Sequence, residues 1–356
     1  MSSPRAVRPG AALLEVLFRM RPEEAIAALF LLPTTWLTSW AHYFGPMSGA
    51  IGPRFAGGVL RIGVAFLCGG TLLVAARRRP APGTPLFMLR EMLPFLLCIL
   101  IYTNLHDTIG FVNSNDIHDT LLALDVWLFG VEPTLWAEQF YSRGRTEAFQ
   151  LFYMSFTLIA PAVPMALLLQ KRSADFRRAS LSIIVCFYMG YALYLIFPSA
   201  PPRIAMAQEF KKTLGGDPVP AEPRALAWPW EAGEASRAAR GAAASPAGSL
   251  DFASRAAENT LALLPTDSRA AFPSLHAAVS LLSLGLAWRF TRPLFFLLTP
   301  AVLGLWASTI YLRHHFVVDL FAGFALAPAA YLLSPRLESW WAARQKIFAP
   351  QIDEPF

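Results

Sequence analysis

The chain has 356 residues, of which 55% are hydrophobic and 15% are charged, and its mean hydropathy is +0.44. Soluble domains average about 25% charged residues, so this composition argues against an ordinary soluble domain and favours a protein solvated mainly by lipid. The net charge of +6 comes without a basic patch interleaved with aromatic residues, which argues against nucleic-acid binding and indicates basic loops that set membrane topology.

Apolar runs long enough to cross a bilayer recur along the whole chain. A transmembrane helix needs roughly 20 largely apolar residues. After a basic amphipathic segment at 1–24, which we expect to lie on the membrane surface, such runs occupy residues 25–44, 59–76, 92–110, 148–169, 179–198, 273–290, 293–311 and 316–334. The expected fold is therefore all-α, a polytopic membrane helical bundle of about six to eight transmembrane helices with interfacial helices and a long outer loop.

These runs suggest a division of the chain into four parts. Segment 106–147 mixes acidic residues with an amphipathic pattern, and we expect helices at the outer interface there, in the position of a lid. Segment 204–270 is rich in Ala, Gly, Pro and charge and is expected to be a partly disordered surface loop. The expected parts are the basic segment 1–24, two accessory transmembrane helices in 25–91, a catalytic membrane core in 92–334 with its outer loop 199–272, and a cytoplasmic tail in 335–356.

Basic residues predict which side of the membrane each loop occupies. The clusters at 77–79 and 171–178 and those that follow the sixth and eighth runs fall on one side if the spans alternate. The positive-inside rule makes that side cytoplasmic, with both termini inside. The polar clusters at 197–203, 272–276 and 311–319 then all lie on the outer face. The composition is compatible with a bacterial inner membrane.

The stretch "YLRHHFVVD" places ionisable groups at the join between two apolar runs. His315 and Asp319 are four residues apart and would share a helix face, so the carboxylate could fix the tautomer of the imidazole and leave its other nitrogen free to attack an electrophile. His314 would point elsewhere. The alternative is a histidine at the interface and an aspartate that caps a helix.

Two further motifs are expected at the same face. In "FPSLHAAVS", Pro273 suits the first helical turn, so that Ser274 and His276 lie where free N–H groups attract a phosphate, and His276 could protonate a leaving oxygen. In "PSAPPR", the prolines end a helix and present Arg203, whose guanidinium matches phosphate oxygens. The alternatives are an ordinary helix start and an arginine that binds lipid headgroups. Together the motifs provide positioning and charge stabilisation for phosphoryl transfer without a metal.

The order of these motifs resembles that of the type 2 phosphatidic acid phosphatase superfamily. The resemblance implies a helical membrane core and catalysis through a phosphohistidine, without a metal or other cofactor. Carried over to this sequence, it implies that His315 is the nucleophile, Asp319 its partner and His276 the general acid. It also implies that Ser274 and Arg203 bind the phosphate.

Two positions differ from the common pattern of that superfamily. Its third motif usually opens with Ser-Arg, where this chain has Ser308 and Thr309, and an arginine follows instead at Arg313, which we expect to bind phosphate. The first motif usually has a lysine where this chain has Ile196. "APPR", "FPSLHAA", "STIYLRHHFVVDLFAG" and "LDVWLFGVEPTLW" look more like the inositol phosphorylceramide synthase (inositolphosphotransferase) branch. The resemblance extends over roughly residues 100–334 and implies a lipid-linked phosphate donor with water or a lipid alcohol as acceptor.

Two other functions fit the same residues. In a transporter, the His and Asp cluster would relay protons or ions. In a metal-dependent hydrolase, His314, His315 and Asp319 would need a ligand from a second segment, such as His106, or His118 with Asp119. The expected partners are a membrane lipid and the bilayer, with neither nucleic acid nor an obligate protein partner.

Overall fold

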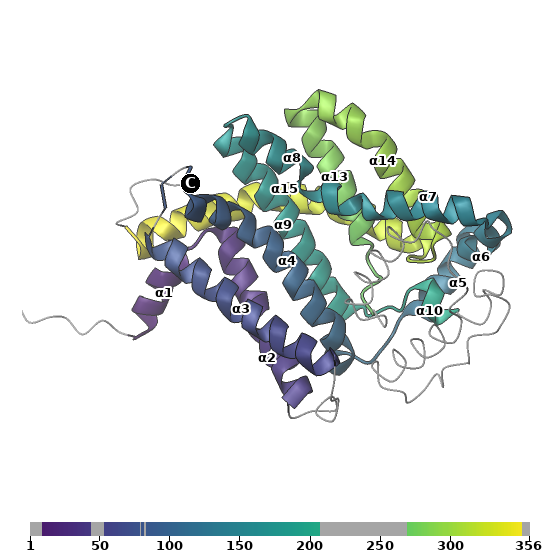
Figure 1. Ribbon diagram of the computed structural model, residues 1–356, viewed down its shortest axis with the longest axis horizontal. Helices are drawn as coiled ribbons and strands as arrows, with labels where there is room; N and C mark the ends of the chain where they lie inside the picture. The colour runs from purple at the N-terminus through teal and green to yellow at the C-terminus, as the bar shows by residue number, and fades with distance from the viewer. Residues whose placement is uncertain (1–8, 44–52, 79, 82, 207–268, 351–356) are drawn as a thin grey trace, which may run out of the picture.

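The computed structural model describes residues 9–43, 53–78, 80–81, 83–206 and 269–350 (Figure 1). Most of the expected surface loop at 204–270 lies outside these ranges. Within them, the chain is helical and contains no strand. The helices are α1 (Pro9–Arg19), α2 (Pro22–Tyr43), α3 (Pro53–Arg78), α4 (Pro85–Val112), α5 (His118–Phe129), α6 (Pro133–Ala137), η1 (Glu138–Phe140), α7 (Arg143–Met154), α8 (Phe156–Leu169), α9 (Ser173–Ile196), α10 (Pro202–Ala205), α13 (Leu275–Phe290), α14 (Arg292–Tyr311) and α15 (Val317–Phe348).

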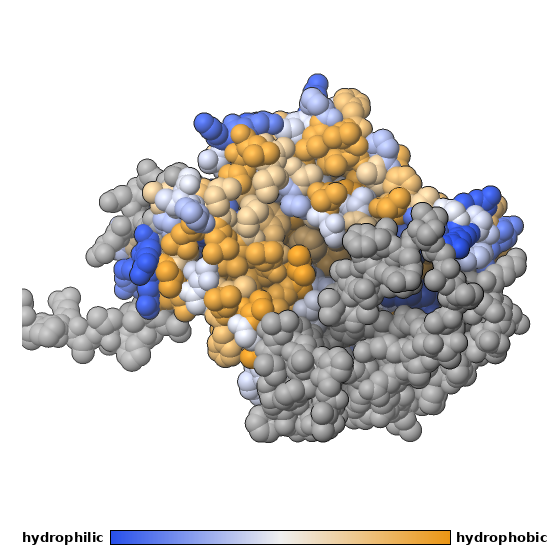
Figure 2. Space-filling view, in the orientation of Figure 1, coloured by the Kyte–Doolittle hydropathy of each residue, from blue (hydrophilic) through white to orange (hydrophobic). Residues whose placement is uncertain are grey.

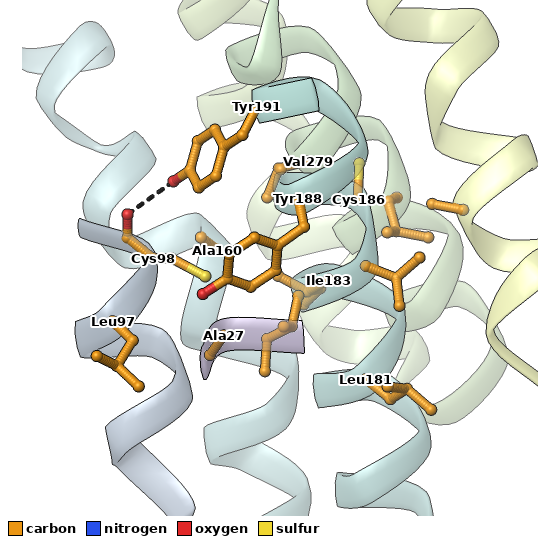
Figure 3. Packing of buried hydrophobic residues seen from close by; sticks show 14 of the residues in the cluster. Ala27, Leu97, Cys98, Ala160, Leu181, Ile183, Cys186, Tyr188, Tyr191 and Val279 are labelled. Carbon is orange, nitrogen blue, oxygen red and sulfur yellow. Dashed lines mark hydrogen bonds between the residues drawn. The ribbon is translucent and has the colours of Figure 1, made fainter. Parts of the chain in front are cut away.

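Helix α13 lies at the centre of a bundle and packs against α8, α9, α14 and α15 (Figure 1). Helix α9 also packs against α4 and α15, and α2, α3 and α4 pack against one another beside it. The core between α4 and α9 contains tyrosines among apolar side chains, and Tyr191 donates a hydrogen bond of 2.8 Å to the carbonyl oxygen of Cys98 (Figure 3). The expected all-α polytopic bundle is confirmed.

Five helical segments of the described chain are long and apolar enough to cross a membrane, or six if the bent pair α5–α6 forms one broken span. The five are Pro85–Leu105, Arg143–Leu169, Ser173–Ile196, Arg292–Tyr311 and Val317–Phe348. Helix α13 is apolar but has only 16 residues. The expected spans at 25–44 and 59–76 coincide with α2 and α3, which are helical but do not belong to these five.

The outer surface of the bundle is apolar in a broad band. Figure 2 shows hydrophobic residues over α2 to α4, α8 and α14, with hydrophilic residues at the edges of the band. A soluble monomer rarely exposes a continuous apolar surface of this extent, whereas the acyl chains of a bilayer would cover it. The chain is therefore an integral membrane protein. Large side chains more than half exposed include Leu29, Leu32, Trp36, Phe66, Leu67, Ile99, Leu151, Leu158, Leu169, Phe296, Leu297 and Leu303.

Two segments extend further as helix than the sequence suggests. Helix α4 continues to Val112, so the first residues of segment 106–147 belong to it, and α5 and α6 then follow with a bend of 68° between them. Helix α15 continues past residue 334 to Phe348, and α1 packs against this extension. There Trp341 donates a hydrogen bond of 3.0 Å to the carbonyl oxygen of Met20. The expected lid and cytoplasmic tail remain predictions.

A glycine allows α13 and α15 to approach closely. A Cβ at Gly323 of α15 would collide with the carbonyl oxygen of Ser274 and would lie 3.0 Å from the Cβ of Ala277. Small residues at such crossings let the backbones of membrane helices pack directly. The contact fixes the start of α13 against the first turns of α15, where the sequence predicts the site.

Candidate active site

The motifs at 197–203 and 272–276 lie side by side in the structure. The N–H of Ser199 donates to the carbonyl of Arg269 at 2.9 Å, and the N–H of Ala271 donates to the carbonyl of Ser199 at 3.1 Å. These bonds form an isolated parallel β-bridge between Ser199 and Ala270. The bridge joins the C-terminal end of α9 to the segment that leads into α13, so Arg203 and His276 approach the same place from opposite ends of a long insertion.

His315 and Asp319 meet, but not on one face of a helix as predicted, because α15 begins at Val317 and His315 precedes it. Asp319 reaches back over the first turn: its Oδ2 accepts hydrogen bonds from the N–H of Phe316 at 3.0 Å and from Nδ1 of His315 at 3.2 Å. A carboxylate only accepts hydrogen bonds, so Nδ1 carries the proton and Nε2 keeps its lone pair. This is the tautomer that a nitrogen nucleophile requires.

His276 lies in the first turn of α13 and faces His315. Its Nδ1 is 3.2 Å from Nε2 of His315. Ser274 is the N-cap, with its Oγ accepting from the N–H of Ala277 at 3.3 Å, and its own N–H donates to the carbonyl of Asp319 at 2.9 Å. The expectation that Pro273 occupies the first helical turn is wrong, because Pro273 precedes the N-cap Ser274.

His314 belongs to the same cluster, so the expectation that it points elsewhere is wrong. Its Nδ1 contacts Nη1 of Arg203, and its ring stacks on Tyr153 with centroids 4.2 Å apart. Tyr153 also lies 4.7 Å from the ring of His276. The reason is the residue before it: Arg313 has φ 60°, a left-handed conformation that turns the chain sharply after α14 and brings His314 and His315 into the site together.

Arg313 contributes its backbone to the site. Its carbonyl oxygen accepts a hydrogen bond of 3.1 Å from the N–H of Arg203. The groups that act electrostatically on its guanidinium are Glu138, Tyr311 and Tyr141, none of which belongs to the histidine cluster. The phosphate contacts predicted for Arg313 and Arg203 both remain predictions, and Nη1 of Arg203 contacts Nδ1 of His314 in the histidine cluster.

Burial keeps the histidines between α14 and α15 neutral. His315 is only 4% exposed, and burial, followed by the positive charge of Arg203, lowers the pKa of its imidazole to about 3. The same two causes, in the same order, hold the pKa of His314 well below its ordinary value. A neutral imidazole is the nucleophilic form, so the electrostatics agree with the tautomer that Asp319 selects.

Asp125 of α5 is a site-shaping residue that sequence reasoning missed. Its two carboxylate oxygens accept hydrogen bonds from the N–H groups of Val317 and Val318, at 2.8 and 2.9 Å, and the side chain is fully buried. A carboxylate at the N-terminus of a helix satisfies its free N–H groups and interacts favourably with its dipole. The signal in the sequence is an acidic residue inside the apolar run "LLALDVWLF".

The acidic and histidine residues of the upstream segment form a separate pair. Nδ1 of His118 lies 2.6 Å from Oδ1 of Asp116 and its Nε2 lies 3.5 Å from Asp119. In the parts of the chain that the structure describes, no group of three His, Cys, Asp or Glu residues could hold a metal ion. The side chain of His106 lies outside those parts.

Comparison with known proteins gives a family for this chain. A family model described as "PAP2 superfamily" matches residues 119–333. Neither the curated proteins nor the solved structures contain a match. The match extends over more than half of the chain, from α5 into α15, and includes Asp125, Arg203, His276 and His315. On this match, and with its histidine cluster between α13 and α15, the chain belongs to the PAP2 superfamily, a family of phosphatases and phosphotransferases.

Proposed function

We propose that this protein is a membrane lipid phosphoesterase or phosphotransferase that acts through a phosphohistidine on His315. One observation carries the proposal: His315 is held by Asp319 at Nδ1 and faces His276 with Nε2, each at 3.2 Å. A base fixed by a carboxylate, with an acid beside its free nitrogen, is the arrangement that nucleophilic catalysis needs.

In the first step, the substrate phosphate binds between His315 and His276 and takes the place of their direct contact. The lone pair on Nε2 of His315 attacks phosphorus, so an N–P bond forms and the P–O bond to the leaving alcohol breaks. His276, which takes up a second proton when the anionic phosphate lies beside it, gives its Nδ1 proton to the leaving oxygen and becomes a neutral imidazole. Asp319 stabilises the positive charge that the imidazole acquires, while Arg203 and Ser274 hold the phosphate oxygens.

In the second step, an acceptor hydroxyl attacks phosphorus, His276 takes its proton, and the N–P bond breaks to restore His315. Water as acceptor makes the enzyme a phosphatase, and a lipid alcohol makes it a transferase. Aromatic rings favour the lipid alcohol, because Tyr153 and Phe156 lie 4.7 and 4.5 Å from the ring of His276 and surround the acid with apolar surface. We therefore propose an inositolphosphotransferase-like reaction, with a phosphoinositol lipid as donor.

The proposed reaction uses no metal, because Arg203 and the start of α13 provide the positive charge that phosphoryl transfer requires. Basic residues cluster after α3, after α8 and between α13 and α14, at the helix ends that do not carry the site. The positive-inside rule makes these ends cytoplasmic, which supports a site at the outer face of a bacterial inner membrane with both termini in the cytoplasm.

The test uses the purified full chain with phosphorus-labelled phosphatidate, polyprenyl diphosphate and phosphatidylinositol, each with and without ceramide or diacylglycerol. We expect transfer from phosphatidylinositol and a protein-bound label that acid releases and base does not. His315→Ala should abolish both, and His118→Ala, outside the cluster, should keep both. Full turnover by His315→Ala with an unchanged melting midpoint would refute the nucleophile. Loss of activity in EDTA that zinc restores would favour a metal enzyme instead.

A further inference from the structure

A cavity of about 190 Å³ lies between the start of α2, the start of α9 and the C-terminal part of α15. It belongs to the opposite end of the bundle from the histidine cluster. Glu338 lies 21 residues after the start of α15 at Val317, and Arg177 lies 19 residues before the end of α9 at Ile196. At 1.5 Å per residue, each helix places the cavity about 30 Å from the site. This is about the thickness of the hydrocarbon core, so the cavity lies at the headgroup level of the other membrane face.

The cavity wall carries charges of both signs. Its lining includes the guanidinium groups of Arg177 and Arg178 and the carboxylates of Glu23 and Glu338. Glu23 is only 7% exposed, and the positive charges of Arg21 and Arg177 both act on its carboxylate. A ligand with positive charge would further compensate this buried carboxylate.

A buried network of ion pairs supports this wall and holds it rigid. Arg21 makes two hydrogen bonds to Glu91, at 2.9 and 2.6 Å, and Arg90 makes two to Glu24, at 2.6 and 2.9 Å. Glu91 also lies 3.7 Å from Arg177, which fixes that guanidinium beside the cavity. The positive and negative sides of the cavity are thus built into the fold rather than left to mobile surface side chains.

We propose that this cavity binds a ligand that carries both a phosphate and an ammonium group, as in the headgroup of a zwitterionic phospholipid such as phosphatidylethanolamine. The phosphate would lie on Arg177 and Arg178, and the ammonium would lie on Glu338 and Glu23. A purely anionic headgroup would meet the two carboxylates, and a purely cationic ligand would meet the two guanidinium groups. Only a ligand with both charges is complementary to the whole wall.

Apolar surface beside the cavity suits the rest of a lipid. Leu181 and Pro335 line the cavity, and Leu332 and Leu333, one turn toward the site along α15, are 57% and 43% exposed. A lipid whose headgroup fills the cavity could place its acyl chains along these leucines. The same chemistry is available from free phosphoethanolamine, so the test separates the two sources.

The test measures lipid retention by native mass spectrometry of the purified full chain with equal amounts of phosphatidylethanolamine and phosphatidylglycerol. We expect the wild-type protein to retain phosphatidylethanolamine about fivefold more than phosphatidylglycerol, which corresponds to about 1 kcal/mol. Arg178→Gln and Glu338→Gln should each bring this ratio close to one, and Glu338→Lys should invert it. Neither side chain makes an ion pair within the described chain, so the variants should keep the wild-type melting midpoint, which is measured in parallel.

Arg336→Gln is the matched control, because Arg336 is exposed on the same helix but does not line the cavity. It should keep the wild-type ratio. Equal retention of both lipids by the wild-type protein would overturn the proposal, and so would equal effects of Arg178→Gln and Arg336→Gln. In a second arm, excess free phosphoethanolamine is added to the protein with its bound lipid. Loss of the lipid would show that the free headgroup suffices for binding, and retention of the lipid would show that the intact lipid is the ligand. Both results support recognition of the paired charges.

Discussion

Replacing Asp125 by asparagine tests whether α5 holds in place the end of α15 that carries the candidate active site. The carboxylate accepts one hydrogen bond on each oxygen, from Val317 and Val318. The carboxamide keeps a single acceptor oxygen, so one N–H at the start of α15 loses its partner, and the attraction between the charge and the helix dipole also disappears. His315 and Asp319 flank this turn, so a shift of the turn changes the position of the proposed nucleophile.

The expected cost follows from these two losses. A hydrogen bond to a charged group contributes about 1.5–3 kcal/mol, and a charge at a helix N-terminus about 0.3–1 kcal/mol. Part of the loss is offset, because the negative charges of Glu132 and Asp319 act on Asp125 and their repulsion ends when the charge is removed. The net destabilisation is therefore about 2 kcal/mol, which lowers the melting midpoint of a chain of 356 residues by about 3 °C.

The assay is thermal unfolding in detergent, followed by tryptophan fluorescence, together with steady-state kinetics on the labelled donor. We expect kcat to fall more than KM changes, because the substrate still binds while His315 is misplaced. Asp119→Asn is the control, since Asp119 lies on the same helix and its side chain is 88% exposed. If Asp125→Asn and Asp119→Asn melt at the same temperature, the reasoning is refuted.

Three further outcomes are expected. Gly323→Ala should cost about 1–3 kcal/mol and lower activity, because its Cβ collides with the backbone of Ser274. Gly285→Ala, with no atom within 4 Å of its Cβ, should keep the activity and should not lower the melting midpoint, because alanine is the better helix former. A phosphodiester donor has a charge that does not titrate between about pH 5 and about pH 7, so it isolates the protonation of His315. With this donor, kcat/KM should not fall from about pH 7 to about pH 5, because the lowered pKa of about 3 keeps the imidazole neutral. A fall in kcat/KM centred at about pH 6.5 would contradict this. A maleimide added to intact cells should label Ser114→Cys, at the site end, and not Ser173→Cys, at the start of α9; the reverse pattern would invert the proposed topology.

The helices and the meeting of the motifs were predictable because both depend on local signals. The predicted spans 179–198 and 293–311 overlap almost completely with α9 and α14, since an apolar run ends where polar or basic residues begin. The shared face of the three polar clusters follows from the number of spans between them, because every second crossing returns the chain to the same face. The sequence alone therefore predicts that His276 and His315 lie at the same face of the membrane.

Contacts that join distant segments could not be predicted from the sequence. Asp125 and Val317 are 192 residues apart, and Arg21 and Glu91 are 70 apart, so no periodicity connects either pair. The prediction that His314 points away from the site was wrong for a different reason. A single residue in the left-handed region, Arg313, redirects the chain, and neither composition nor spacing indicates such a conformation for an arginine.

Because of the bridge between Ser199 and Ala270, the geometry of the candidate catalytic groups does not depend on the length of the insertion. Its two backbone hydrogen bonds close the insertion at its base, so Arg203 and the start of α13 keep their mutual position whatever number of residues lies between them. Residues can be added to or removed from that stretch without altering the distance between guanidinium and imidazole. A change in the length of the insertion should therefore leave the candidate phosphate-binding groups in place.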